Sequence, residues 1–301
     1  MRARILITVM LALLLLMTWA TTVGAVPPLP FTVYGRVQIN GENALVGTEV
    51  KAYVDGSLQA TTTVTTYQGT PVFVLDIPGS AYWVPSSGGP PEAGKTVTFT
   101  VAGAVAGQTT TWTMGGSQVL TLTVSGLTQL SLSTGWNLVS IPIVPSSTTF
   151  NDVLASIVGE YDLVYSYIAS DPTDPWKKYN TAAPPFLNDL TEINERMGFW
   201  IRTSGAKPLT VSGVAPLSPT IPLVTGWNLV GYPSQVTRPI TEALASIAGK
   251  YDLVYTYDAS DMADPWKKYN VAAPPFLNDL VVMSPRRGYW IRVTQDCTWK
   301  P

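Results

Sequence analysis

The sequence predicts a mostly β protein, in which an N-terminal antiparallel β-sandwich precedes two copies of a small α+β module. Two observations carry this prediction. First, residues 31–124 alternate between apolar and polar side chains and are interrupted by turn signals, as in short strands. Second, a stretch of about 70 residues is written twice, so the chain contains a tandem duplication. The shared segments include residues 135–139 and 226–230, 161–165 and 251–255, 174–180 and 264–270, 182–190 and 272–280, and 198–202 and 288–292.

The first 25 residues have the pattern of a secretory signal peptide. Arg2 and Arg4 precede an apolar run over residues 5–17, and small residues follow as far as Ala25. The run is too short to span a membrane comfortably. We therefore expect cleavage after Ala25 and a secreted or cell-surface protein without a membrane span. Cleavage leaves 276 of 301 residues and changes the formal net charge from −2 to −4, which does not favour nucleic acid as a partner.

Residues 26–130 are expected to form the sandwich. The turn signals include Asn40-Gly41 and Gly115-Gly116, and no convincing helix is present. Residues 89–96 match the letters of a phosphate-binding loop, but Pro90 and Pro91 lack N–H donors and a strand follows, so we expect a plain loop. The expected strands are residues 31–39, 48–54, 58–65, 71–77, 96–101, 109–114 and 119–124.

Residues 131–213 and 220–301 are expected to form the two α+β repeats, joined by a stiff linker over residues 214–219. Each repeat should have one helix on a mainly antiparallel sheet. In the first copy, Thr148 is the expected N-cap and Gly159 the stop, and apolar residues at 150, 153, 154 and 157 recur at helical spacing. The expected strands are residues 136–141, 163–168, 176–179, 198–202 and 209–211, with counterparts at 227–232, 253–257, 266–269 and 288–292.

Two resemblances extend this reading. The opening YGRV with GTEVKAY at residues 47–53 resembles carboxypeptidase-regulatory-like and bacterial immunoglobulin-like domains, which implies a spacer or adhesion module. The opening GWNLVSIP with a later GFWI or GYWI resembles a repeat of exported bacterial and archaeal surface proteins, which often follows immunoglobulin-like modules. That resemblance covers about half of the chain. It implies an extracellular modular protein and transfers no catalytic residue.

Several kinds of chemistry are disfavoured. The chain contains no His, which excludes Ser–His and Cys–His nucleophilic systems and imidazole metal ligands. Cys297 is the only cysteine, so no internal disulfide is expected. Ser204 and Lys207 match a loose S-x-x-K pattern that lacks its partner motifs and is absent from the second copy. We expect no enzymatic activity and no cofactor.

The Asp residues allow two other roles. Paired carboxylates can hydrolyse glycosides. Most Asp residues of the two repeats, however, lie in turn-like stretches, where a role in turns and caps is the better interpretation. Calcium is the next option because it prefers several oxygen ligands. Its candidate ligands are Asp171 and Asp174 in the first copy and Asp261 and Asp264 in the second.

Aromatic residues beside lysines are the main candidates for binding, because aromatic faces suit the C–H faces of sugar rings. The alternative is that these rings close the core of a small module, and we favour it for Trp176; Trp136 and Trp200, on strands, are expected in the core. The candidate ligand-binding residues are Trp176, Lys178, Tyr179 and Phe186, with Trp266, Lys268, Tyr269 and Phe276.

Three functional hypotheses follow. The first is a secreted, non-enzymatic modular protein for surface attachment, adhesion or envelope structure. The second is a carbohydrate-binding protein that uses the aromatic segments of the two repeats, with a polysaccharide or envelope component as partner. The third, a glycan-active hydrolase, is disfavoured because the sequence does not indicate a cleft with two facing carboxylates. Exposure of Trp176 and Trp266 would separate the first two hypotheses.

Overall fold

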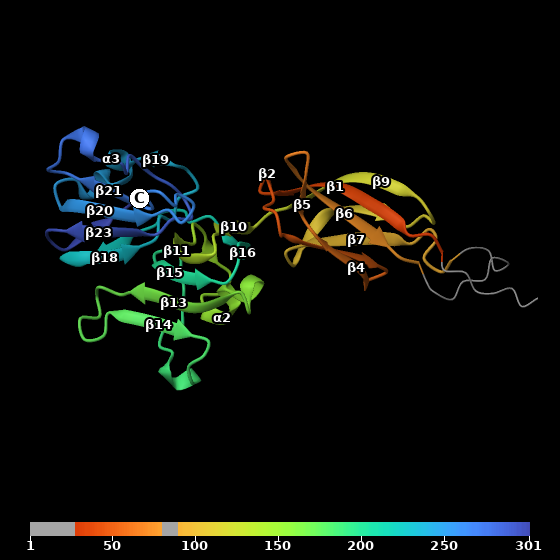
Figure 1. Ribbon diagram of the computed structural model, residues 1–301, viewed down its shortest axis with the longest axis horizontal. Coiled ribbons are helices and arrows are strands. Elements are labelled where there is room, and N and C mark those ends of the chain that lie inside the picture. The colour runs from red at the N-terminus through yellow and green to blue at the C-terminus, as the bar shows by residue number, and fades with distance from the viewer. Residues whose placement is uncertain (1–27, 80–89) are drawn as a thin grey trace, which may run out of the picture.

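The computed structural model describes residues 28–79 and 90–301 and confirms a mostly β protein (Figure 1). A sandwich lies on one side and the two repeats on the other, and β10 and β16 lie where they meet (Figure 1). The expected signal peptide, residues 1–25, lies outside the described residues. Within the described ranges, the helices are too short or too polar to cross a bilayer.

The sandwich packs two sheets around one core. The first has the order β2-β1-β6-β5, with β9 paired to the other side of β1, and the second has the order β4-β3-β7-β8. The core includes the fully buried Phe73, Phe99 and Trp112. The strands are β1 (Phe31–Ile39), β2 (Glu42–Asn43), β3 (Glu49–Val54), β4 (Ser57–Thr63), β5 (Thr65–Tyr67), β6 (Thr70–Ile77), β7 (Thr96–Val101), β8 (Ala104–Thr111) and β9 (Ser117–Val124).

Two details of the sandwich bear on the sequence-based expectations. Strand β9 runs parallel to β1, from Thr32 opposite Ser117 to Ile39 opposite Val124, so the sandwich is not wholly antiparallel. Local alternation cannot reveal this, because it marks the buried face of a strand and carries no information about direction. The described part of the loop over residues 89–96 is a turn, in which the Ala93 N–H bonds the Pro90 carbonyl, and β7 follows it.

The two repeats have the same sheet order, β11-β15-β13-β14 in the first and β18-β23-β20-β21 in the second, and every pairing in these two sheets is antiparallel. The first repeat contains β10 (Leu127–Leu132), β11 (Gly135–Ser140), β12 (Val144–Pro145), α2 (Phe150–Val153), β13 (Tyr161–Tyr167), β14 (Trp176–Asn180), β15 (Gly198–Thr203) and β16 (Lys207–Val214), and the 3-10 turns Ala155–Ile157 and Pro185–Leu187.

The second repeat has the same sheet and helix as the first and differs in its short strands. It contains β17 (Ile221–Leu223), β18 (Gly226–Val230), β19 (Arg238–Pro239), α3 (Ile240–Ala243), β20 (Tyr251–Tyr257), β21 (Trp266–Asn270), β22 (Val282–Met283), β23 (Tyr289–Val293) and β24 (Cys297–Trp299), and the 3-10 turns Ala245–Ile247 and Pro275–Leu277.

The helix of each repeat is shorter than its pattern predicts. The first begins after Thr149, not Thr148, and no side chain caps its N-terminus. It covers one α-helical turn, continues as a 3-10 turn and stops before Gly159, whose φ is +83°. Burial of Phe150 and Val153 holds this segment in place, which agrees with the rule that packing stabilises short helices more than propensity does.

Three outer strands of the repeats, β10, β17 and β24, are absent from the expected strands, whereas β16 contains the expected strand over residues 209–211. Strand β10 pairs with β16, so the boundary expected between residues 130 and 131 falls inside a strand. Its counterpart β17 pairs with β24 near the end of the chain. On β24, Trp299 is fully buried and its indole N–H donates to the carbonyl of Ala243 at 2.7 Å. These pairings join residues 74 to 85 positions apart in the chain, which explains why local periodicity does not reveal them.

The Asn of each repeated GWNLV segment has a structural role. Asn137 is 3% exposed, and its side-chain amide accepts from the Ser133 N–H at 2.8 Å. It also donates to the carbonyls of Ser133 and Gly135, at 2.7 and 3.0 Å. Asn228 makes the equivalent three bonds in the second repeat. One buried amide therefore closes the turn that leads into the first sheet strand of each repeat.

The repeats join through two backbone hydrogen bonds, each from the end of the first sheet strand of one repeat to the segment that precedes the last sheet strand of the other. The Ser140 N–H donates to the Arg286 carbonyl at 3.1 Å, and the Gly231 N–H donates to the Arg196 carbonyl at 2.8 Å. These two bonds occupy equivalent positions in the two copies, so the contact has approximate two-fold symmetry. Gly198 and Gly288 lie in the same contact, where an added Cβ would come within 3 Å of the other repeat. This close approach explains the Gly in the GFWI and GYWI motifs.

Candidate binding surface shared by the two repeats

The outer face of each repeat sheet carries aromatic side chains. On β15, Phe199 and Ile201 are buried while Trp200 and Arg202 point to the other face, as a strand's alternation requires. The pairing register places Tyr165 opposite Trp200, and Tyr167 opposite Trp176. The second repeat has the same arrangement on β23, β20 and β21.

These rings form one continuous aromatic surface across both repeats. Neighbouring ring centroids lie 5.2–6.4 Å apart throughout. Four of these contacts cross between the repeats: Trp200 meets Tyr257 and Trp266, and Trp290 meets Tyr167 and Trp176. The aromatic surface consists of Trp136, Tyr165, Tyr167, Trp176, Trp200, Trp227, Tyr255, Tyr257, Trp266 and Trp290.

The aromatic surface contains two shallow hollows. One, of about 450 Å³, is lined by four rings of the second repeat, namely Trp227, Tyr255, Trp266 and Trp290. The other, of about 550 Å³, is lined by the four equivalent rings of the first repeat together with Tyr257 and Trp266. Larger hollows of about 630 and 560 Å³ lie where the sandwich meets the repeats, but no aromatic side chain lines them.

An ion pair borders the aromatic surface at each end. The Arg202 guanidinium lies over the Trp136 ring, 5.5 Å from its centroid, and bonds both carboxylate oxygens of Asp162 at 2.8 and 2.6 Å. This hydrogen-bonded guanidinium lowers the pKa of Asp162 below its usual value. Arg292, Trp227 and Asp252 repeat the arrangement in the second copy. Each end therefore offers donors and acceptors with no net charge.

The sequence-based predictions for the tryptophans need correction. Trp176, for which we favoured a core position, is 47% exposed, and its counterpart Trp266 is 45% exposed. Trp136 and Trp200, also expected in the core, are half-buried rings of the aromatic surface. The reason is geometric: the buried face of each strand is already filled by the alternate residues, such as Phe199 and Ile201, so the tryptophans occupy the other face.

The remaining candidate ligand-binding residues lie beside this surface or away from it. Tyr179 stacks on the core residue Phe150, with ring centroids 4.1 Å apart, and Tyr269 packs against the core of the second repeat. Phe186 and Phe276 are 83% and 82% exposed on separate loops and contribute to neither hollow. Lys178 and Lys268 lie on the same strand face as the tryptophans but do not line the hollows.

Each candidate calcium pair binds a lysine of its own repeat. The Lys177 ammonium lies 3.0 and 3.1 Å from the carboxylates of Asp171 and Asp174. This hydrogen-bonded ammonium lowers the pKa of Asp171. Lys267 holds Asp261 and Asp264 in the same way, at 2.8 and 3.2 Å. Across residues 28–79 and 90–301, three or more His, Cys, Asp or Glu side chains nowhere gather as a metal site would require.

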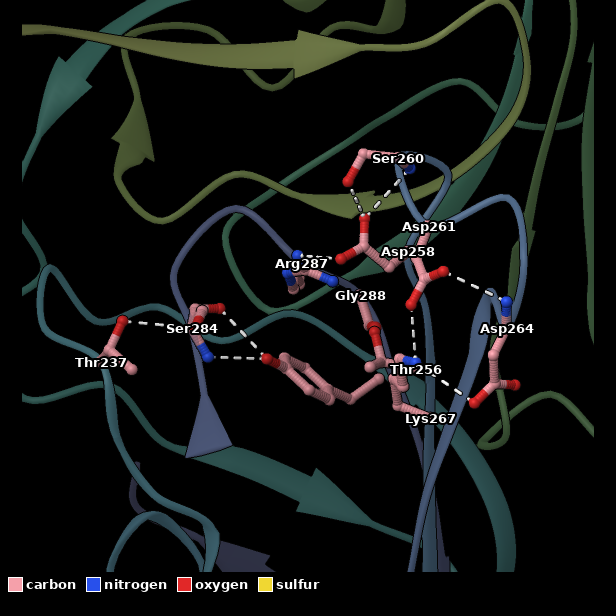
Figure 2. A network of polar contacts seen from close by, with 11 residues as sticks. Thr237, Thr256, Asp258, Ser260, Asp261, Asp264, Lys267, Ser284, Arg287 and Gly288 are labelled. Carbon is pink, nitrogen blue, oxygen red and sulfur yellow. Dashed lines mark hydrogen bonds and ion pairs between the residues drawn. The ribbon is translucent and has the colours of Figure 1, made fainter. Parts of the chain in front are cut away.

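The polar network of the second repeat (Figure 2) includes one ion pair, between Asp258 and Arg287, that the first repeat lacks because apolar residues stand at the equivalent positions. The Asp258 carboxylate accepts from the Arg287 guanidinium at 2.5 Å and from the Ser260 hydroxyl at 2.6 Å. Burial raises the pKa of Asp258, but these hydrogen bonds outweigh it and the pKa lies below its usual value. The Arg287 carbonyl also accepts from the Ser140 hydroxyl of the first repeat at 2.7 Å, so this network reaches the contact between the repeats.

The sequence contains a signal for the rings that we missed. In residues 199–202, apolar Phe199 and Ile201 alternate with Trp200 and Arg202, and an Arg at the end of a strand indicates the face that meets solvent. Trp200 shares that face. The same argument applies to residues 289–292. What alternation could not show is that the two outer faces meet, because that depends on how the repeats dock.

No protein-family model matches the chain, and no curated protein matches it. Among solved structures, the chain is similar to the Bacillus anthracis TIE protein, with 8% sequence identity and a TM-score of 0.20. The match covers 92% of this chain and 45% of that protein, so the chain spans less than half of its length. A likeness at this TM-score carries no argument about function.

Proposed function

We propose that this protein is an exported, non-enzymatic attachment protein whose aromatic surface binds a polysaccharide of a cell surface or envelope. The observation that carries the proposal is the contiguous set of ten rings with Trp176 and Trp266 about half exposed. Exposed apolar surface of this kind is costly unless a ligand or partner covers it. Sugar rings present C–H faces that pack on aromatic faces, and their hydroxyls need polar partners nearby.

The border of the surface supplies such partners. The Arg202–Asp162 and Arg292–Asp252 pairs lie next to the outermost tryptophans and are 39–52% exposed. Lys178 and Lys268 lie on the same strand face, and among the described residues neither ammonium has an ion-pair partner. Sugar hydroxyls can therefore exchange bonds with water for bonds with charged groups that remain at the edge of the site.

The state of the carboxyl groups supports binding without catalysis. Glycoside hydrolysis needs one carboxyl group that keeps its proton, which requires a raised pKa. Asp162 and Asp252, which border the aromatic surface, are instead bonded through both carboxylate oxygens to Arg202 and Arg292, and this hydrogen bonding lowers their pKa. These carboxylates are committed to ion pairs and hydrogen bonds.

A second candidate function is a structural contact with another envelope protein. Phe186 and Phe276 protrude from loops of identical sequence, each after two prolines. The Asn188 side chain closes the first loop through two bonds to the backbone of Asn180, at 2.9 and 3.2 Å. The apolar tip is therefore ordered before any partner arrives, which lowers the entropic cost of association.

The test is retention of purified residues 26–301 on a panel of insoluble polysaccharides and cell-wall fractions, with and without calcium. A Trp176→Ala/Trp266→Ala double variant should lose retention. Both rings lie at the start of edge strands and are half exposed, so the variant should keep its fold, which circular dichroism checks. Loss of retention without calcium would instead revive a metal role for the Asp pairs.

The matched control is Phe186→Ala/Phe276→Ala, which removes two equally duplicated and more exposed rings outside the aromatic surface. This variant should be retained like the unmodified protein. Retention that depends on Phe186 and Phe276, and not on the tryptophans, would favour the protein-contact function. Failure of the unmodified protein to bind any matrix would contradict the polysaccharide proposal.

A further inference from the structure

We infer that the two repeats form one composite site, not two, and that this site takes a single uncharged polysaccharide chain in either direction. This inference rests on the proposed function and specifies its ligand. Four features of the aromatic surface favour such a site: the continuity of its rings, their spacing and tilt, the charge at its border and the approximate two-fold symmetry.

The aromatic rings continue without a gap from one repeat to the other. Trp266 of the second repeat lines both hollows. The contacts from Trp200 to Trp266 and from Trp176 to Trp290 have centroid distances of 5.6 and 5.7 Å, shorter than several contacts inside one repeat. A ligand that covers one hollow therefore touches a ring of the other, and binding at the two hollows cannot be independent.

The spacing and tilt of the rings favour one extended chain over a flat crystalline face. Steps of 5.2–6.4 Å between neighbouring centroids are comparable with the length of one pyranose residue, so successive sugars can each meet a ring. The four pairs that cross between repeats are tilted by 52–59°. A flat surface would lie against only a few of these rings, whereas a single chain can turn from ring to ring.

The charges favour a neutral ligand. Only aromatic residues line the two hollows, and the guanidinium at each end is already paired with Asp162 or Asp252. Lys178 and Lys268, which have no ion-pair partner among the described residues, lie outside both hollows. A chain of uronic acids would bring its carboxylates beside those Asp residues. Its carboxylates would lose their hydration on entering the hollows and would meet no cation there. Neutral hydroxyls carry a much smaller desolvation cost.

Because of the approximate two-fold symmetry, the site does not distinguish the two directions of a polysaccharide chain. Exchange of the two repeats replaces Trp136 by Trp227, Trp176 by Trp266 and Trp200 by Trp290. A polysaccharide has a reducing and a non-reducing end, so reversing it in the site presents each end to an equivalent set of rings. Both orientations should therefore be populated, and no chain end is needed for binding.

Isothermal titration calorimetry tests the composite site with cellohexaose, xylohexaose and chitohexaose as neutral probes and hexagalacturonate as the charged probe. We expect one neutral hexasaccharide per protein chain. Trp176→Ala alone and Trp266→Ala alone should each lower affinity by about tenfold or more, which corresponds to about 1.4 kcal/mol. Phe186→Ala should leave affinity unchanged.

A stoichiometry of two, with each single Trp variant retaining one site of unchanged affinity, would overturn the composite site and leave polysaccharide binding intact. Binding of hexagalacturonate as tight as that of the neutral probes would overturn the charge argument. If no probe binds and no polysaccharide matrix retains the protein, the proposed function fails as well. Retention of polymers without hexasaccharide binding would overturn the single-chain site alone.

Direction is tested by NMR with the tightest neutral hexasaccharide, spin-labelled at its reducing end. The label should broaden the indole N–H signals of both Trp136 and Trp227, because the labelled end occupies either side. Broadening of only one of the two signals would refute binding in both directions. Trp112, buried in the sandwich core, provides an indole signal that should stay sharp.

Discussion

The contact between the repeats should fail when either motif glycine gains a methyl group. In Gly198→Ala the new Cβ would lie 2.7 Å from the carbonyl oxygen of Val230 and 2.9 Å from the Cδ1 of Leu229. In Gly288→Ala it would lie 2.9 Å from both Leu138 Cδ1 and the Val139 carbonyl oxygen. Each clash involves a backbone oxygen of the other repeat, which cannot rotate away as a side chain can.

The magnitude follows from how the clash is relieved. Ordinary carbon–oxygen contact would require the repeats to separate by roughly 0.5–1 Å, a gap that forfeits a quarter to a half of the local dispersion energy. Overpacking of this kind costs about 1–3 kcal/mol, against total stabilities of about 5–15 kcal/mol. The two glycines share one contact, so the double variant should lose less stability than the sum of the single losses.

Urea unfolding followed by tryptophan fluorescence measures this effect, because six of the ten rings of the aromatic surface are indoles beside the contact. Gly205→Ala is the matched control: an added Cβ at Gly205 meets no atom within 4 Å. We expect an unchanged or slightly higher unfolding midpoint for this control. Equal midpoints for Gly198→Ala, Gly288→Ala and Gly205→Ala would refute the close approach of the repeats.

Three further outcomes are expected. Asn137→Ala removes three buried hydrogen bonds and should lower the free energy of unfolding by about 2–3 kcal/mol, measured by urea unfolding. The buried hydroxyl of Tyr232 lacks a partner among the described residues, so Tyr232→Phe should raise the free energy of unfolding by about 1 kcal/mol. Tyr289→Phe should instead destabilise the protein, because it leaves the backbone N–H of Ser284 without its hydrogen-bond acceptor. Equal thermal midpoints for the two variants would contradict this contrast. The pKa of Asp258 is lowered by its folded partners, so its pairing with Arg287 stabilises the protein above the unfolded pKa of about 3.9 and fades as pH falls through the folded value. Asp258→Asn should therefore be less stable than the unmodified protein at pH 7, by about 1 kcal/mol or less, and the difference should vanish as the pH falls below the folded pKa of Asp258. A difference that persists in acid would refute the linkage.

Much of the architecture is legible in the sequence because it depends on short-range patterns. The duplication is visible from identical segments, and alternation marks β1, β6, β7 and β9 closely. The signal for the outer position of Trp200 is also local, since Arg202 marks the same strand face. These features depend on the backbone period of two residues per strand repeat, which any stretch of the chain carries within itself.

The contacts between distant faces of the molecule follow only from its folded structure. The pairing of β10 with β16 and of β17 with β24, the parallel direction of β9, and the docking of Gly198 and Gly288 all join residues far apart in the chain. Such contacts depend on matched shape and on hydrogen bonds between distant segments, and local periodicity carries no information about either. Two similar β-rich modules with tryptophan-bearing strands can be predicted from the amino-acid order alone. Only the exchange of backbone bonds between those modules brought the tryptophans into one surface.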